Sequence, residues 1–318
     1  MTKAANRTTF PLLNPKNDLR HDIAVRPKAR ESIAYMMQML DEGIFISAYT
    51  WISTEGIVGR AVSAAGPGVG EMVLEHVEGV EGGADQNFDD WNVAGLSVRH
   101  TRLLEEADIV YAGQDMQLDL HFTALHPAFG HSSQPQRNGH PLFIADDRLE
   151  QSGRVVGTVT IRDKTYSVDT WLHRDHSWGV RDWSQIQHHK WFTAQTASVN
   201  AYLFQIFGRG ETWLYGYVDR DGLMARITDA VIDVEYEAPC YGQKSPHFEL
   251  LDDAGRTTVI DAETYALVPF RVDENSKLHE AGMRTTIEGE RGAGHLGILW
   301  PITYVEALAE LESAKRPA

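Results

Sequence analysis

Short runs of alternating apolar residues, separated by turns rich in Gly, Asp and Asn, recur along most of this sequence. A period of two is that of a β-strand with one buried face. Long helical segments do not alternate with these runs, which argues against a parallel α/β sheet. The pattern therefore predicts an all-β fold built from antiparallel barrels or sandwiches.

Turn residues locate individual hairpins within this pattern. Residues 33–40 and 44–52 flank Asp41-Glu42-Gly43, where the glycine can adopt the left-handed conformation of a bulged hairpin. Residues 34–40 also have good helix propensity, but we favour the hairpin. Further hairpins are expected at residues 155–161 with 165–172, at 212–218 with 223–227, and on either side of 252–255.

The end of the chain and two internal stretches depart from the strand pattern. Residues 303–315 have helical periodicity and are expected to form a short helix that covers a barrel, with Tyr304, Leu308 and Leu311 on one face. Residues 78–90 are acidic and rich in Gly, and residues 130–139 contain Ser, Gln, Pro and Asn. Both stretches are therefore predicted to be exposed loops.

The length of the chain favours two domains. A chain of 318 residues exceeds the usual size of one compact core. The strand alternation is lost near residues 182–189, which is the best place for a boundary. We therefore predict an N-terminal arm at residues 1–30, a first β domain at residues 31–186 and a second at residues 187–318.

The charge balance limits the partners of the chain. Asp and Glu outnumber Lys and Arg by 45 to 29, which gives a formal net charge of -16. Without a basic cluster, such a surface repels phosphate backbones and anionic lipids. The apolar runs are also too short to span a membrane. We expect no nucleic-acid partner and no stable membrane insertion.

Cysteine usage and the N-terminus favour a cytoplasmic protein. Cys240 is the single cysteine, which excludes an internal disulfide and a zinc site of several thiolates. It follows Pro239 without an obvious activating base, and we interpret it as structural. The first ten residues lack the apolar core of a secretion signal.

The densest group of chemically able side chains runs from His173 to Trp183. If the strand at residues 165–172 continues through this run, Asp175 lies on one face, and His176 and Trp178 lie on the other. A desolvated carboxyl can donate a proton at neutral pH, an indole can stabilise a cation, and an imidazole can position water. These groups suit hydration of an alkene or its reversal, and they are equally typical of a network that braces a domain junction.

The same residues resemble a known family. The segment 174–179 with Arg181 and Trp183, preceded by Glu150 to Gly157, is similar to the signature of the carotenoid 1,2-hydratase (hydroxyneurosporene synthase)-like proteins and, more distantly, of decalin-forming Diels-Alderases. Upstream similarity covers Glu31-Ser32, residues 95–98 and residues 118–124, so that the resemblance spans about residues 20 to 190.

This resemblance implies two lipocalin-like (calycin-type) β domains with an apolar ligand pocket at or near their junction. It also implies that His176 and Trp178 correspond to a His-x-Trp pair of the active site. The family carries a downstream Tyr-x-Asp pair whose Asp donates the proton, whereas this sequence has Tyr202 followed by Phe204. Another group, such as Asp175, must then supply the proton if the reaction is hydration.

The resulting hypothesis is a cofactor-independent hydro-lyase or isomerase that acts by proton transfer on a hydrophobic unsaturated substrate, such as a terpenoid or steroid. Asp175 is predicted to be the acid, His176 the base or water-positioning group, and Trp178 the cation-stabilising ring. Arg181 is predicted to orient Asp175 or a substrate oxygen, and Tyr202 to be a second donor. The predicted substrate-binding residues are His173, Trp171, Trp183, Trp191 and Phe204.

Two other classes of function remain as alternatives. One is a cofactor-free cyclase or pericyclase, whose pocket shapes a flexible polyene. The other is a lipocalin-like binding protein in which the polar run only braces the junction. We expect no metal, because the histidines between residues 173 and 189 lack the spacing of ligands on one strand face. A homodimer is compatible with the sequence.

Overall fold

The computed structural model describes residues 7–81, 83–238 and 241–315 of the chain and is almost entirely β, as the sequence predicted. It forms two compact units: unit 1 comprises Met1–Pro135 and Gly139–Arg181, and unit 2 comprises Gln136–Asn138 and Asp182–Ala318. Cys240, interpreted above as structural, lies outside the described residues. No helix in the described ranges is long and apolar enough to cross a membrane.

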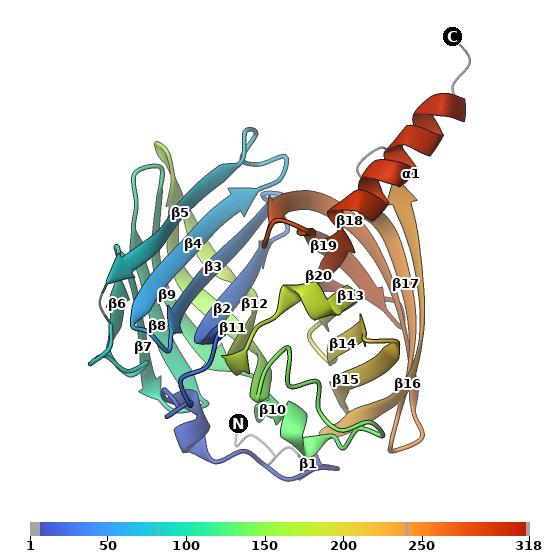
Figure 1. The fold of residues 1–318 in the computed structure, drawn as a ribbon, viewed down its shortest axis with the longest axis horizontal. Helices are drawn as coiled ribbons and strands as arrows, with labels where there is room; N and C mark the ends of the chain where they lie inside the picture. Colours follow the sequence, from blue (N-terminus) through green and yellow to red (C-terminus); the bar gives the residue numbers. More distant parts are fainter. Residues whose placement is uncertain (1–6, 82, 239–240, 316–318) are drawn as a thin grey trace. The chain divides into compact units, whose positions relative to one another are not determined.

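Unit 1 contains an antiparallel sheet that curls into a half-barrel (Figure 1, blue to green). The strand order is β5-β4-β3-β2-β12-β11-β9-β8-β7-β6, and β10 pairs with β11. The elements are β1 (Arg7–Thr8), η1 (Pro15–Asp18), β2 (Ala29–Met39), β3 (Ile44–Ser53), β4 (Ile57–Ala65), β5 (Val73–Glu81), β6 (Trp91–Val93), β7 (Leu96–Arg102), β8 (Glu106–Ala112), β9 (Met116–Ala124), β10 (Phe129–Gly130), η2 (His131–Ser133), β11 (Asp147–Ile161) and β12 (Lys164–Val180).

The concave face of this sheet holds the apolar core of unit 1. Alternate residues of each strand contribute to it, as the period of two requires, and Ile33, Phe122 and Val155 are fully buried there. Each such aliphatic or aromatic side chain contributes about 1.5–3 kcal/mol when it is removed from water. Leu172, on β12, belongs to the same core, so the even-numbered residues of β12 point toward it.

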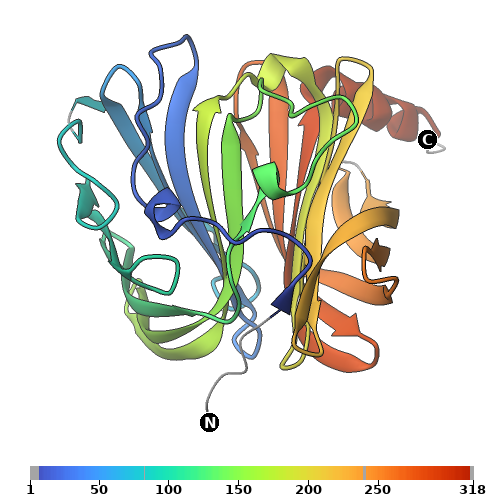
Figure 2. The same cartoon turned by 90° about the horizontal axis from the view of Figure 1, so that it is seen from below.

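Unit 2 is a closed eight-stranded antiparallel barrel followed by a helix (Figure 1 and Figure 2, yellow to red). The strand order is β16-β15-β14-β13-β20-β19-β18-β17, and the pairing of β16 with β17 closes the ring. The elements are η3 (Trp183–Gln185), β13 (Ile186–Gln195), β14 (Asn200–Gly208), β15 (Glu211–Arg220), β16 (Leu223–Glu237), β17 (Gly242–Asp252), β18 (Thr257–Arg271), β19 (Ser276–Ile287), β20 (Glu290–Pro301) and α1 (Ile302–Lys315).

The barrel core is filled by side chains rather than left as a wide channel, as expected for eight strands. Phe192 and Phe248 stack across it with their ring centroids 3.7 Å apart, and Leu203 is fully buried beside them. Because successive side chains alternate, Trp191 and Phe204 project from the opposite face of their strands and belong to no part of this core.

The predicted hairpins form in the structure. Met39 pairs with Ile44 across the first turn, and Gly43 has a φ of 65°, the left-handed value that its turn required. Helix propensity in residues 34–40 is overridden because the strand pairs with neighbours on both edges. The other three predicted pairs are β11 with β12, β15 with β16 and β17 with β18.

Three expectations about the surface hold only in part. The residues at the start of the predicted 78–90 loop belong to β5, which continues to Glu81. His131 and Gln134, in the second predicted loop, are buried. The C-terminal helix forms, but Tyr304 and Leu311 on its predicted apolar face are more than half exposed, whereas Val305 is buried. Composition indicates polarity but does not say which residues another segment covers.

A buried ion pair ties the N-terminal segment to the sheet of unit 1. Arg174 on β12 donates to both carboxylate oxygens of Asp18 in η1, at 2.7 and 3.2 Å, and both residues are 1% exposed. Gln151 accepts two further hydrogen bonds from Arg174, and His100 hydrogen-bonds to the Asp18 backbone carbonyl. Burial alone would raise the pKa of Asp18, but Arg174 and His100 hold it well below its usual value.

We predict that Asp18→Asn destabilises the protein by about 3–5 kcal/mol, because it leaves the Arg174 charge buried without its counterion. The matched control is Asp169→Asn, which breaks a pair with Arg154 that is exposed on both sides and costs at most about 1 kcal/mol. The free energies of unfolding are measured in urea. Equal losses in the two variants would contradict a stabilising role for the Asp18–Arg174 pair.

Candidate functional site

Strand β12 carries the polar run singled out in the sequence and sorts its side chains onto two faces. Asp175 and His173 project from one face, and Arg174, His176 and Trp178 project from the other, toward the concave core. This is the division that the sequence predicted. Asp175 and His176 are therefore separated by the sheet and lie in different environments.

On the first face, Asp175 belongs to what we call the acid network, namely Arg148, Glu150, His173 and Asp175. Antiparallel pairing of β11 with β12 places Glu150 opposite Asp175. The Arg148 guanidinium donates to a carboxylate oxygen of each acid. His173 donates from Nε2 to Glu150 Oε2 at 2.8 Å, and its Nδ1 lies 3.1 Å from the hydroxyl of Ser152.

The acid network places two carboxyls, Glu150 and Asp175, side by side in a buried place. Burial raises the pKa of Asp175, and the neighbouring Glu150 adds to this, whereas Arg148 opposes it. Glu150 has partners on both oxygens, but Asp175 Oδ1 is buried and has no hydrogen-bond partner among the described residues. A proton is therefore best accommodated on Asp175 Oδ1, where it relieves the repulsion between the two carboxylates.

Arg181 lies near the acid network, within the electrostatic influence of Arg148 and Asp175. Its guanidinium donates to the hydroxyl of Ser177 at 2.6 Å, while Arg148 pairs with Asp175. Burial lowers the pKa of Arg181 to about 9, and the neighbouring Arg30 and Arg148 add to this. Arg181 is still a cation at neutral pH, so it can attract a substrate oxygen.

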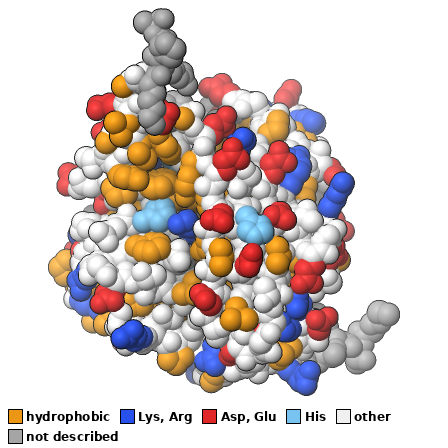
Figure 3. Space-filling view, turned by 90° about the vertical axis from the view of Figure 1, so that its right-hand side faces the viewer, with side chains coloured by type: hydrophobic (Ala, Val, Ile, Leu, Met, Phe, Trp, Pro, Cys, Tyr) orange, Lys and Arg blue, Asp and Glu red, His pale blue; other side chains and the backbone are white. Residues whose placement is uncertain are grey.

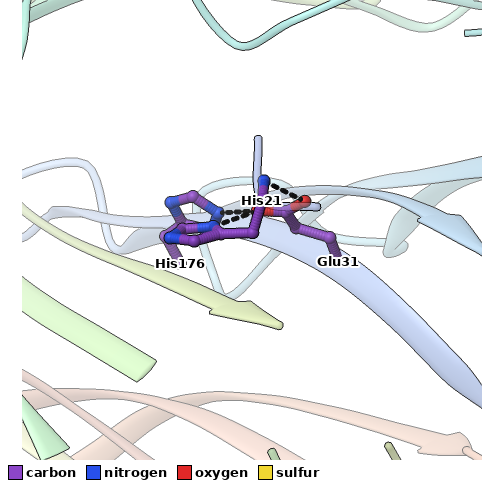
Figure 4. Close-up of side chains that lie close together, drawn as sticks. All are labelled: His21, Glu31 and His176. Atoms are coloured by element: carbon purple, nitrogen blue, oxygen red, sulfur yellow. Dashed lines mark hydrogen bonds and ion pairs between the residues drawn. The ribbon is translucent and has the colours of Figure 1, made fainter. Parts of the chain in front are cut away.

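On the opposite face, His21, Glu31, His176 and Trp178 form what we call the imidazole cluster, and Figure 4 shows the first three of them. Glu31 Oε1 lies 2.7 Å from His176 Nε2 and 2.7 Å from His21 Nδ1. His21 stacks on Trp178 with the ring centroids 3.6 Å apart. Burial would raise the pKa of Glu31, but hydrogen bonds from the two histidines lower it to about 2.

His21, Glu31 and His176 are the residues in the described ranges that could hold a metal, since their ligand atoms lie within 4.8 Å of one another. A metal-bound histidine normally donates its second ring N–H to a neighbouring acceptor. The Nδ1 of His176 is buried and has no partner in the part of the chain that the structure describes. The distances of 2.7 Å are those of hydrogen bonds. The geometry favours a hydrogen-bonded triad.

A small pocket adjoins the imidazole cluster within unit 1. It has a volume of about 250 Å³ and is lined by residues 20–23, Val25, Glu31, residues 52–54, Gly56 and Ala84. His21 and Glu31 reach this pocket, whereas His176 is fully buried behind them. The cluster can therefore exchange protons with the pocket through His21.

The remaining predicted site residues are distributed over both units. Trp171 lies on β12 with Arg154 5.4 Å from its ring centroid. In unit 2, Trp183 packs near His189, and His189 packs on Phe204 with 5.2 Å between ring centroids. Trp191 contacts His295, and Tyr202 lies against Tyr217. Trp191, Tyr202 and Phe204 share the strand face opposite to the barrel core.

Sequence reasoning missed four residues that the structure brings to these clusters. Arg148 and Glu150 could have been found by extending the predicted hairpin at residues 155–172 backward, because its register pairs Glu150 with Asp175. His21 and Glu31 carry no such signal. His21 belongs to the segment before β2, and its place beside Trp178 depends on how that segment folds over the sheet.

The architecture and these buried polar networks define a two-unit, lipocalin-like β protein. The chain belongs to the family DUF7064, described as a domain of unknown function, whose model matches residues 14–302. A search of the curated proteins found no match.

Solved structures share the fold at low sequence identity. A Nitrosomonas europaea protein provisionally named AttH matches with a TM-score of 0.67 and 13% identity, covering 94% of this chain and 97% of that one. Kievitone hydratase from Nectria haematococca matches with a TM-score of 0.65 and 8% identity, covering 93% of this chain and 96% of that one. The structure of CghA with Sch210972 matches with a TM-score of 0.60 and 12% identity, covering 86% of this chain and 89% of that one. These likenesses support the broad structural group indicated by the sequence and do not single out its carotenoid-hydrating members.

The lowered pKa of Glu31 predicts acid sensitivity. A carboxyl whose pKa falls from 4.5 to about 2 on folding stabilises the native state above pH 4.5, and this contribution, roughly 3 kcal/mol, is lost as the pH falls toward 2. Glu31→Gln should remove this part of the pH dependence, whereas the exposed control Glu78→Gln should retain it. Urea unfolding at several acidic pH values measures the difference. Parallel pH profiles for wild type and Glu31→Gln would refute the assignment.

Proposed function

We propose that this protein is a cofactor-independent enzyme that transfers a proton to a hydrophobic unsaturated substrate, with Asp175 as the general acid. The observation that carries the proposal is a buried carboxyl with a raised pKa and an oxygen free to carry the proton. A carboxylic acid kept neutral by its surroundings can donate a proton at physiological pH. Its reaction class is that of a hydro-lyase or a double-bond isomerase.

In the proposed step, Asp175 Oδ1 gives its proton to one carbon of a double bond, and the second carbon becomes cationic. Arg148 then stabilises the carboxylate left behind, because its guanidinium already contacts Asp175. Water adds to the cation and releases a proton, or a neighbouring carbon loses a proton and the double bond moves. In both cases one proton returns to Asp175, so the cycle balances without a redox partner.

The other residues take roles set by their positions. Glu150 holds His173 and Arg148 in place and is a positioning residue. Arg181 is proposed to attract a substrate oxygen, and Tyr202 to act as a second donor. Trp171, Trp183, Trp191 and Phe204 are proposed to contact the substrate. His176 and Trp178 face the core of unit 1, so the proposal does not depend on them for the acid step.

Two features support this reaction class. The fold is shared with kievitone hydratase over most of both chains, and the acid network contains a buried carboxyl, Asp175, for the role of the downstream Asp that this sequence lacks. A small terpenoid, steroid or related alkene is the proposed substrate, and the cytoplasm is the proposed location. The alternatives are a cofactor-free cyclase and a ligand-binding protein. Both are compatible with the structure of CghA with Sch210972, in which this fold is seen with a bound compound.

The test is Asp175→Asn, measured on a panel of hydrophobic alkenes that includes kievitone. Wild type in D2O should place deuterium on substrate carbon, which mass spectrometry detects. The variant should retain ligand affinity and lose about 10²- to 10⁴-fold in turnover. Because the acid must be protonated, wild-type turnover should fall as the pH rises through the raised pKa of Asp175. Asp169→Asn, on the same strand and exposed, is the control.

The contrary outcomes separate the alternatives. A cyclase would turn over a polyene equally well with Asn at position 175 and would incorporate no deuterium. A binding protein would bind compounds of the panel and convert none of them. Arg148→Lys tests the same network without touching the acid: if Asp175 is the donor, the alkaline limb of the pH profile should shift.

A further inference from the structure

The interior of the unit 2 barrel contains a cation, Lys190, that forms no ion pair with a carboxylate of the described residues. Lys190 lies two residues before Phe192 on β13, and residues two apart on a strand share a face. Because Phe192 belongs to the barrel core, the side chain of Lys190 also points into the barrel. Among the described residues it forms no ion pair, and its ammonium contacts His188 Nε2 at 2.9 Å. A half-buried lysine without a counterion is uncommon, because burying an unpaired charge costs free energy.

His188 is arranged to accept a hydrogen bond from Lys190 and not to repel it. The Nδ1–H of His188 donates to the Leu299 carbonyl at 2.7 Å, which leaves Nε2 as the acceptor. Burial lowers the pKa of His188 to about 3, and the charge of Lys190 adds to this. The imidazole is therefore neutral at physiological pH, and Lys190 is the cation of this pair.

Aromatic and aliphatic side chains surround Lys190 at this end of the barrel. Phe207 lies 5.6 Å from the ammonium, measured to its ring centroid. Trp300 packs on His188 at 4.5 Å and on Tyr236 at 5.3 Å between ring centroids. Further partly buried apolar residues pack on the same core, namely Leu214, Ile232, Val234 and Leu267. Hydrophobic side chains also gather beside a histidine and a Lys or Arg on the face drawn in Figure 3.

A second unused donor lies beside the lysine. The Nε1 of Trp300 is buried and has no partner among the described residues, although a buried indole N–H normally finds one. The strand register places Lys190 opposite Ile298, two residues before Trp300 on β20. The ammonium of Lys190 and the indole N–H are thus two donors set in an apolar wall, which is the chemistry that recognises a carboxylate.

We propose that this end of the barrel binds an apolar carboxylic acid, with its carboxylate on Lys190 and Trp300 Nε1 and its apolar body among Phe207, Tyr236 and Trp300. The site lies within unit 2 and does not depend on the proton-transfer function of Asp175. It would give the protein a second ligand, such as a medium-chain acid, in addition to the proposed substrate of Asp175.

Burial lowers the pKa of free Lys190 to about 8, so the site should lose its charge in mildly alkaline solution. A bound carboxylate would oppose this loss by stabilising the ammonium. The titratable groups on the elements packed around Lys190 are His188, which contacts it, His279 and Lys277 on β19, and Tyr236 and Tyr304, which pack on Trp300. Burial lowers the pKa of His279 to about 4 and raises that of Tyr236 to about 12, so neither titrates in the same range as Lys190.

The experiment compares octanoate with octan-1-ol by isothermal titration calorimetry on the whole protein. Wild type should bind octanoate, and Lys190→Met should weaken octanoate binding about tenfold or more with the alcohol unaffected. Lys190→Arg should retain most of the affinity, and the exposed control Lys244→Met should match wild type. Octanoate binding to wild type should weaken between about pH 7 and about pH 10, whereas octan-1-ol binding should not.

Trp300→Phe provides a second variant should Lys190→Met fold poorly, and it should also weaken octanoate selectively. The proposal is overturned if wild type does not bind octanoate. It is also overturned if octanoate and octan-1-ol show the same pH dependence and the Lys190 and Trp300 variants bind octanoate as wild type does. Octanoate and octan-1-ol are both followed by binding and not by turnover. A lack of octanoate binding would therefore leave the proposed function of Asp175 unaffected. Conversely, loss of turnover in Asp175→Asn should leave octanoate binding unaffected.

Discussion

The antiparallel register of β11 with β12 is the constraint on which the chemistry of unit 1 depends. It pairs the two strands along the whole of β11 and places Glu150 directly opposite Asp175. Two buried carboxylates at adjacent positions cannot both be charged cheaply unless cations lie beside them. Arg148 reaches both carboxylates, and the register brings Glu150 close enough to add to the rise in the pKa of Asp175 that burial causes.

The same strand supports a second set of polar groups with a different purpose. One residue from Asp175, Arg174 points to the other face and forms a bidentate pair with Asp18. Both carboxylate oxygens of Asp18 accept hydrogen bonds from Arg174, which holds the N-terminal segment. Glu31 holds the same segment through its hydrogen bond with His21. We interpret these groups as structural, because they hold the N-terminal segment on the sheet. On the proposed catalytic face, a carboxylate oxygen of Asp175 has no hydrogen-bond partner among the described residues.

The barrel of unit 2 repeats this contrast between satisfied and unsatisfied groups. Its deep core is apolar and stacked around Phe192 and Phe248, which needs no ligand. Near one end the interior changes to Lys190 and Trp300, whose donors have no carboxylate acceptor among the residues that the structure describes. A core closed to solvent would favour apolar side chains at these positions. Packing alone therefore does not explain why Lys190 and the indole N–H of Trp300 lie inside the barrel.

The sequence by itself determined the all-β class, four of the hairpins, the C-terminal helix and the division of β12 into two faces, because these depend on a period of two and on turn residues that are local. It also selected Asp175 as the acid candidate. Only the tertiary structure decided that Arg148 and Glu150 share its environment, that His176 is held by Glu31 and His21, and that Trp191 and Phe204 lie outside the barrel core. These are contacts between strands and segments distant in the chain, and a side chain's charge state depends on the neighbours that such contacts bring.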